Sequence, residues 1–170
     1  MKDLDMIRTI KSTSVQETIA AGRSFASELH RGDVVALYGE LGSGKTQFVK
    51  GVCEAFSVQA NVTSPSFIIL NRYVGSDKLG EELLVYHLDL YRVRSSEELY
   101  DIGFEEFFYG NGICLIEWAD MLQDLVPSNR HDVRLRSCDL EDHRMIEIEK
   151  ISGDVGKTDG TLRNVRKIAL

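Results

Sequence analysis

Apolar and polar positions in the first third of the chain follow a helix, strand, helix pattern. Within residues 14–29 the apolar side chains recur every three or four positions, which is the period of one helical face. Ser14 is the first residue of this stretch and Glu17 follows three residues later, as in a capping box at a helix start. Residues 34–38, VVALY, form an apolar run rich in β-branched residues, which predicts a buried parallel strand. A second helix is expected from about residue 45 to about residue 56.

The remainder of the chain contains further short apolar runs separated by turn signals. Strands are expected at residues 67–73, 82–90 and 112–118, and Ser95 followed by Glu98 predicts one or two short helices between the last two. From residue 131 onward polar and apolar residues alternate in two stretches, as in an antiparallel hairpin at a sheet edge. Residues 152–170 show little periodicity. We therefore expect one domain over residues 1–151 and a loose C-terminal tail over residues 152–170.

A phosphate-binding loop lies between the first predicted strand and the second helix. Gly39, four further residues, Gly44, Lys45 and Thr46 reproduce the spacing G-x-x-x-x-G-K-T. Glycines let the backbone N–H groups point at phosphate oxygens, the lysine adds a positive charge, and the threonine hydroxyl is a Mg²⁺ ligand. The predicted nucleotide contacts in this loop are Glu40, Leu41, Gly42, Ser43, Gly44, Lys45, Thr46 and Gln47. A second GKT at residues 156–158 lacks the first glycine and is interpreted as a decoy.

This motif and the strand and helix order predict a three-layer α/β fold of the phosphate-loop NTPase class. We expect a mostly parallel central sheet with an antiparallel edge hairpin, and nucleotide at the carboxyl ends of the strands at 34–38 and 113–116.

A second acid near the Mg²⁺ is expected at the end of a neighbouring buried strand. Glu117 ends one such strand and Asp89 ends another, and Glu117 is expected to lie closer to the metal because its strand is more apolar. His87 is a candidate to act on the attacking water or to orient Asp89, although a histidine in a strand is often only a packing residue. Thr63, Ser64 and Ser66 surround a proline in a loop expected near the γ-phosphate.

Composition and charge narrow the class of protein further. The 170 residues are 43% hydrophobic and 28% charged, with a formal net charge of −7 and three widely spaced cysteines without a CxxC pair. The negative charge disfavours unaided binding of nucleic acid, which normally requires a basic face. The apolar runs are too short to span a membrane, and the first residues lack the apolar core of a secretion signal. We expect a cytoplasmic protein with reduced thiols and no membrane partner.

The blocks GELGSGKTQFVKG, VTSPSF, YHLDLYR and LIEWAD occur in the order and spacing of the bacterial TsaE family. The chain resembles that family over about residues 10–150. The resemblance implies an ATPase subunit that works with the TsaB and TsaD subunits in forming threonylcarbamoyladenosine in tRNA. TsaD performs the transfer, tRNA is reached only through the complex, and ATP hydrolysis resets or supports the TsaB–TsaD transferase.

The resemblance also assigns roles to individual residues. It implies ATP and Mg²⁺ as cofactors, with Thr46 and Glu117 as metal ligands and Asp89 supporting the metal or the water. The predicted catalytic residues are Lys45, Asp89, Glu117 and His87. The N-terminal segment near Thr13 and Val15 and the late hairpin near Arg144 are expected at the nucleotide base. Ser66 stands where the family often has threonine, which keeps the hydroxyl.

Two other classes of nucleotide-binding protein remain open alternatives at this level. A small-molecule kinase would need a substrate pocket and an arginine-rich lid, for which only YRVR at residues 91–94 is a candidate. A GTPase would need an N-K-x-D motif, which the sequence does not contain, and DKLG at residues 77–80 lies in a polar turn.

Overall fold

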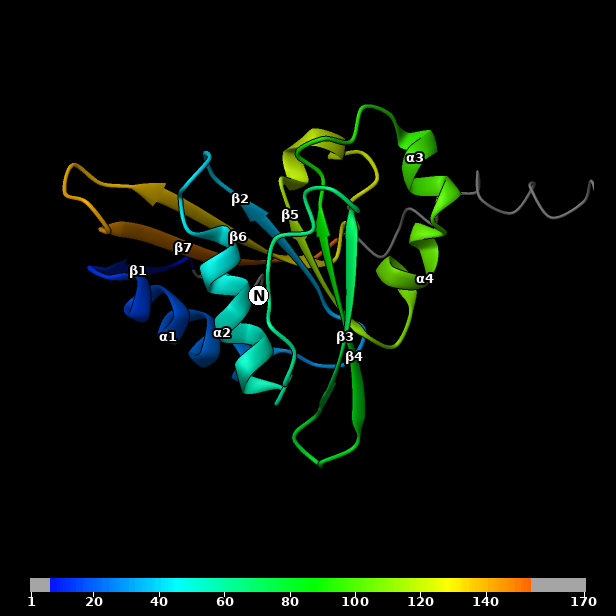
Figure 1. Ribbon diagram of the computed structural model, residues 1–170, viewed down its shortest axis with the longest axis horizontal. Helices are drawn as coiled ribbons and strands as arrows, with labels where there is room; N and C mark the ends of the chain where they lie inside the picture. The colour runs from blue at the N-terminus through cyan, green and yellow to red at the C-terminus, as the bar shows by residue number, and fades with distance from the viewer. Residues whose placement is uncertain (1–6, 154–170) are drawn as a thin grey trace, which may run out of the picture.

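A computed structural model describes residues 7–153 as seven strands in one sheet with helices on both faces (Figure 1). The order of strands across the sheet is β1-β7-β6-β2-β5-β4-β3. The strands are β1 (Arg8–Ser12), β2 (Val34–Tyr38), β3 (Leu70–Ser76), β4 (Glu82–Asp89), β5 (Ile113–Glu117), β6 (Arg130–Ser137) and β7 (Arg144–Ile151). The helices are α1 (Val15–Phe25), α2 (Lys45–Ala55), α3 (Ser96–Asp101) and α4 (Phe104–Tyr109), with 3-10 turns η1 (Ala26–Glu28) and η2 (Ala119–Leu122).

The centre of the sheet is parallel and both flanks are antiparallel. β2 pairs in parallel with β5 and β6, and β5 pairs in parallel with β4. β3, β7 and β1 complete the sheet through antiparallel pairs. The predicted fold class and the adjacency of β2 and β5 are therefore confirmed.

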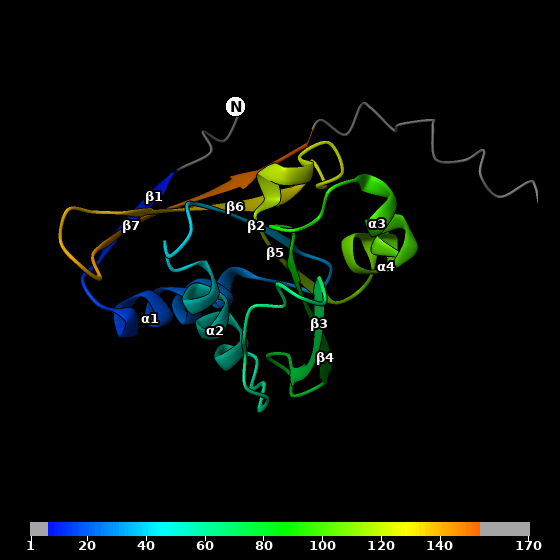
Figure 2. The ribbon, with the colours of Figure 1, turned by 45° about the horizontal axis from the view of Figure 1, so that its top comes forward.

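Two hydrophobic cores lie on opposite faces of the sheet, because side chains alternate along each strand. Val35 and Leu37 of β2 pack toward α1 and α2, whereas Val34 and Ala36 pack toward α3 and α4. Figures 1 and 2 show α1 and α2 together on one side of the sheet and α3 and α4 on the other. This arrangement buries all five residues of β5 and leaves the ends of the central strands to form a site.

A local capping signal places the start of α1 as expected. The Ser14 hydroxyl accepts a hydrogen bond from the Glu17 N–H at 3.1 Å. The Glu17 carboxylate accepts from the N–H of Thr13 at 2.6 Å, one residue before the position that a standard capping box uses. The helix after the phosphate loop begins at Lys45 and ends at Ala55, as predicted.

Helices α1 and α2 cross at two glycines that permit very close backbone contact. A Cβ atom added at Gly22 would lie 2.1 Å from the carbonyl oxygen of Phe48. A Cβ atom added at Gly51 would lie 1.9 Å from the carbonyl oxygen of Ile19. Both distances are far shorter than a van der Waals contact, so the crossing requires glycine at both positions.

Two strands differ from the sequence-based expectation. The hairpin of β6 and β7 is present, but β1 pairs outside β7 and forms the edge on that side. β3 begins at Leu70 instead of residue 67, because residues 65–69 form a turn in which the Pro65 carbonyl accepts from the N–H groups of Ile68 and Ile69. Ile69 closes this turn with a φ of 66°.

The expected C-terminal tail lies, apart from residues 152 and 153, outside the described residues, as does the second GKT sequence. Within residues 7–153 no helix is long and apolar enough to cross a membrane.

Candidate functional site

The phosphate loop connects β2 to α2 in a conformation that depends on glycine. Gly39 has a φ of 144° and Gly44 has a φ of 101°, both in the region that side chains disfavour. A Cβ atom at Gly39 would lie 2.3 Å from the carbonyl oxygen of Leu135 on β6. The loop is therefore shaped by its own glycines and by close packing against the neighbouring strand.

Lys45 is held at the base of this loop with 4% of the residue exposed. Its ammonium donates to the carbonyl oxygens of Gly39 at 2.7 Å and Glu40 at 2.9 Å, and it lies 3.9 Å from the centre of the Trp118 ring. Burial lowers the pKa of Lys45, and the negative charge of Glu117 opposes that effect. Among residues 7–153 no carboxylate forms an ion pair with the lysine that would neutralise its charge.

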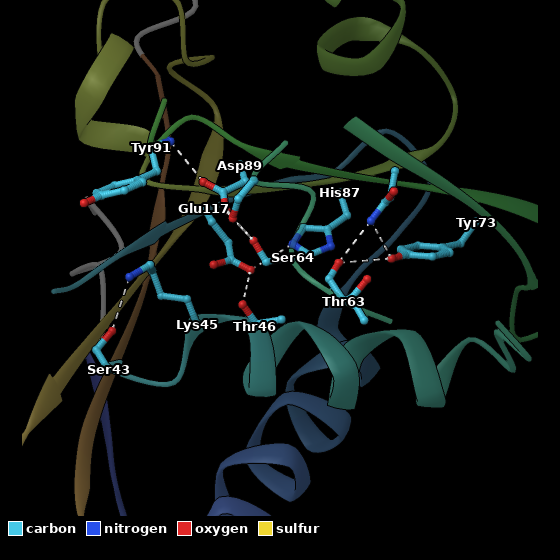
Figure 3. A network of polar contacts seen from close by, with 12 residues as sticks. Ser43, Lys45, Thr46, Thr63, Ser64, Tyr73, His87, Asp89, Tyr91 and Glu117 are labelled. Atoms are coloured by element: carbon cyan, nitrogen blue, oxygen red, sulfur yellow. Dashed lines mark hydrogen bonds and ion pairs between the residues drawn. The ribbon is translucent and has the colours of Figure 1, made fainter. Parts of the chain in front are cut away.

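Glu117, at the end of β5, links the phosphate loop to β4. Its Oε1 atom accepts from the Thr46 hydroxyl at 2.8 Å and lies 2.8 Å from Nε2 of His87 (Figure 3). Because a carboxylate only accepts hydrogen bonds, Nε2 of His87 is the donor. The histidine thus contacts Glu117, whereas the sequence suggested Asp89 as the acid that it orients.

Asp89, at the end of β4, anchors the loop at residues 63–66. Its Oδ2 atom accepts from the hydroxyls of Ser64 at 2.5 Å and Ser66 at 2.9 Å, and its Oδ1 atom accepts from the N–H of Tyr91 at 3.0 Å. The carbonyl of Thr63 accepts from the side chain of Asn71 on β3 at 3.0 Å. This loop is consequently tied to two strands of the sheet.

These groups surround a cavity of about 370 Å³. The cavity is lined by Val15, Thr18, Leu41, Gly42, Gly44, Lys45, Thr46, Gln47, Ser64, Ser66, Asp89, Glu117, Asp142 and Arg144. Most of the predicted site residues are thus brought together. Thr13, Glu40, Ser43 and His87 are outside this lining; Glu40 and Ser43 are chain neighbours of lining residues, and His87 contacts Glu117.

Thr18 and Asp142 line the cavity but were not predicted. Thr18 is in the first turns of α1, and its hydroxyl is bonded to that of Ser12 at 2.8 Å. Asp142 is in the turn between β6 and β7 with a φ of 62°. Neither belongs to a motif, and only the tertiary fold brings them to the phosphate loop. Arg144 reaches the same place, where its guanidinium donates to the Gly42 carbonyl at 3.1 Å.

The chemistry of the lining suits a magnesium-bound phosphate. Asp89 and Glu117 are register partners on β4 and β5 and are both buried, so two carboxylates lie side by side where a cation would stabilise them. Hydroxyl and carboxylate oxygens are the ligands that Mg²⁺ prefers. No group of three or more His, Cys, Asp or Glu residues in the described part of the chain could hold a metal alone. A metal here would therefore take further ligands from the Thr46 hydroxyl, water and phosphate.

A strand, a glycine loop and a helix with this lysine and threonine define the phosphate-loop fold class. Within that class the chain belongs to the TsaE family: residues 12–146 match the model of the threonylcarbamoyl adenosine biosynthesis protein TsaE.

Individual relatives agree with this assignment. The chain is 39% identical over 125 residues to tRNA threonylcarbamoyladenosine biosynthesis protein TsaE of Treponema pallidum, covering 74% of this chain and 88% of that protein. It is 36% identical over 126 residues to the Bacillus subtilis protein of the same name, covering 74% and 75% of the two chains. The crystal structure of Bacillus subtilis YdiB superposes with a TM-score of 0.71 at 29% identity, covering 89% of this chain and 90% of that one.

Proposed function

We propose that this chain binds and hydrolyses ATP as a subunit of the machinery that forms threonylcarbamoyladenosine in tRNA. The observation that carries the proposal is the convergence of Lys45, Thr46, Asp89 and Glu117 on one cavity, in a chain of the TsaE family. The loop N–H groups and Lys45 would hold the phosphates, and the adjacent acids would hold the cation that accompanies them. Mg²⁺·ATP, when bound, would supply the phosphoanhydride bond that is hydrolysed, and the charge of the Mg²⁺ ion would polarise that bond.

Glu117 is the better candidate for the acid nearest the metal. Thr46, whose hydroxyl would ligate Mg²⁺, already donates to Glu117, whereas Asp89 is occupied by two serine hydroxyls and a backbone N–H. We assign Asp89 to support of the metal or of the attacking water. Its contacts to Ser64 and Ser66 would make this support depend on the position of the loop at residues 63–66.

We assign the base of the nucleotide to the part of the cavity formed by the start of α1 and the start of β7. Val15 at the start of α1 and Arg144 at the start of β7 both line it. Thr13 precedes Val15 by two residues, and its hydroxyl and N–H both donate to Glu17. We propose that Thr13, Val15 and Arg144 contact the base or ribose.

TsaB and TsaD are the proposed partners, and the loop beside the cavity offers a surface for them. Phe67 is 85% exposed and the adjacent Ile68 is 65% exposed, so two neighbouring large apolar side chains face solvent together. The Arg92 guanidinium lies 4.5 Å from the centre of the Phe67 ring. With a net charge of −7, the chain is proposed to reach tRNA only through these subunits.

The proposal is tested by size-exclusion chromatography of the purified chain with purified TsaB and TsaD, with and without Mg²⁺·ATP. Co-elution with the TsaB–TsaD pair, together with release of ADP and inorganic phosphate, is the expected result. Failure to co-elute under either condition would contradict the proposed assembly. Appearance of a phosphorylated small molecule in place of free phosphate would favour the kinase alternative.

A further inference from the structure

His87 is a buried polar side chain between Tyr86 and Leu88 of β4. It lies on β4, where its side chain is fully buried, and it does not line the cavity. A residue in this position cannot contact a water molecule that attacks a phosphate in the cavity. Any contribution it makes to the site must pass through a neighbouring side chain.

The neighbour is Glu117, and the geometry of the contact is specific. Nε2 of His87 and the hydroxyl of Thr46 both donate to the same atom, Oε1 of Glu117, at 2.8 Å each. Oε2 makes no hydrogen bond to any residue in the described part of the chain. The two donors thus fix one carboxylate oxygen and leave the other available toward the cavity that Glu117 lines.

The other ring nitrogen gives the histidine no stabilising hydrogen bond of its own. With Nε2 protonated, Nδ1 is an acceptor, and among residues 7–153 it is buried without a hydrogen-bond partner. An unpaired buried acceptor is destabilising, and an aliphatic side chain would fill this strand position without that penalty. The ring of Tyr73, 6.4 Å away between centres, packs beside the imidazole and offers apolar surface.

We infer that His87 is a positioning residue that holds Glu117 through Oε1 and so presents Oε2 to Mg²⁺ or to a water bound to it. This inference rests on the proposed function and deepens it, because it assigns His87 to metal binding and not to proton transfer. Neighbouring donors that orient a metal-binding carboxylate typically change metal affinity by roughly 10–100-fold when removed.

The test is isothermal titration calorimetry of ATP binding at a series of Mg²⁺ concentrations and in EDTA. His87→Leu removes the donor, whereas the side-chain amide of His87→Gln can place an N–H near the position of Nε2. We expect His87→Leu to lower the affinity for Mg²⁺ in the presence of ATP by roughly 10–100-fold, as read from how ATP binding changes with Mg²⁺ concentration. The ATP affinity in EDTA should be unchanged. His87→Gln should retain most of the Mg²⁺ dependence.

A matched control is available in His131, a second buried histidine in the parallel part of the sheet. It packs against the Phe25 ring, and its Nε2 atom lies 3.7 Å from Oδ2 of Asp33, too far for a hydrogen bond, with no other partner among the described residues. His131→Leu should leave the Mg²⁺ dependence of ATP binding at the wild-type value. In a Glu117→Ala background, His87→Leu should cause no further loss, because the residue through which it acts is absent.

The outcomes separate this inference from the proposed function. Wild-type protein that binds no ATP at any Mg²⁺ concentration overturns both. Wild-type binding with an unchanged Mg²⁺ dependence in His87→Leu overturns the inference alone. Equal losses in His87→Leu and His131→Leu, or an undiminished further loss in the Glu117→Ala background, would also overturn it, because a general loss of structure would then explain the effect.

Discussion

Lys45, Asp89 and Glu117 are charged residues at positions that are at most 4% exposed. Charges in such positions are tolerated only with partners, and each of these side chains has them. Loop carbonyls and the Trp118 ring surround the lysine, while hydroxyl and N–H groups surround the two acids. Because the two acids lie side by side, the arrangement favours a bound cation.

Lys45→Ala should weaken ATP binding by roughly 10–100-fold, since a hydrogen bond to a charged group contributes about 1.5–3 kcal/mol. ATP hydrolysis should fall at least as far while the fold is retained, because the ammonium contacts only the loop and one ring. Calorimetric titration with Mg²⁺·ATP measures the effect. Lys50→Ala on the same helix, outside the cavity lining, is the control. Wild-type affinity in Lys45→Ala would place the nucleotide elsewhere.

The three cysteines should differ sharply in reactivity. Burial raises the pKa of Cys53 to about 12 and also raises the pKa of Cys114, so both thiols stay protonated at pH 8. Cys138 is exposed, and all three thiols are free. Mass spectrometry after brief alkylation of the native protein at pH 8 should find one modified site, at Cys138. Equal labelling of Cys53 or Cys114 without denaturant would contradict the burial of α2 and β5.

The crossing of α1 and α2 fixes the helix that follows the phosphate loop. Gly51→Ala should destabilise the fold by about 1–3 kcal/mol or more, because the new methyl group would overlap the Ile19 carbonyl. Helix propensity alone would favour alanine by about 1 kcal/mol. Ala55→Gly, exposed on the same helix, measures that propensity effect without the overlap. Urea unfolding that shows Gly51→Ala to be as stable as the wild type would refute the close crossing.

Elements with strong local signals were predictable from the sequence. The capping residues of α1, the glycine loop before α2 and the apolar run of β5 each encode their structure within a few residues. The edge strand β1 was not predicted because RTIKS has little apolar pattern and becomes a strand only by pairing with β7. The turn at Ile69 was also missed, because β-branched residues disfavour a positive φ.

The site residues that belong to a local sequence motif were likewise predictable, whereas those that only the tertiary fold brings together were not. The loop residues and the two acids follow from motif and strand ends, and the cavity contains them. Thr18 and Asp142 belong to α1 and to a turn of the hairpin, which no local pattern connects to the phosphate loop. The contact of His87 with Glu117 could not be predicted from the sequence either, because this contact depends on β4 lying beside β5 in one particular register.

In the whole molecule, the cavity lies beside an apolar loop that residues 7–153 leave exposed. Phe67 and Ile68 follow directly after the serines that bind Asp89. A partner that packs on these side chains would also close water out of the cavity, which strengthens charge interactions there. We therefore expect TsaB–TsaD to set the geometry of Asp89 and to accelerate ATP hydrolysis.

Arg92→Ala should have little effect on the isolated chain and a larger one in the complex. Its guanidinium holds the Phe67 ring, and a cation–π contact at an exposed site contributes about 0.5–1 kcal/mol, which corresponds to roughly a two- to five-fold change. ATP turnover of the variant, alone and with TsaB–TsaD, gives the comparison. Arg72→Ala, exposed on β3 away from the cavity, is the control. Equal losses in both settings would remove the docking role of Arg92.

The rate of ATP turnover of the wild-type chain, measured alone and with purified TsaB and TsaD in Mg²⁺, tests whether the cavity is an ATP site controlled by these partners. Slow turnover alone, a clear acceleration by the partners and loss of both rates in Lys45→Ala are the predicted results. Turnover that is unchanged by the partners would contradict the proposed control by docking. Turnover that persists in Lys45→Ala would contradict the assignment of the cavity as the ATP site.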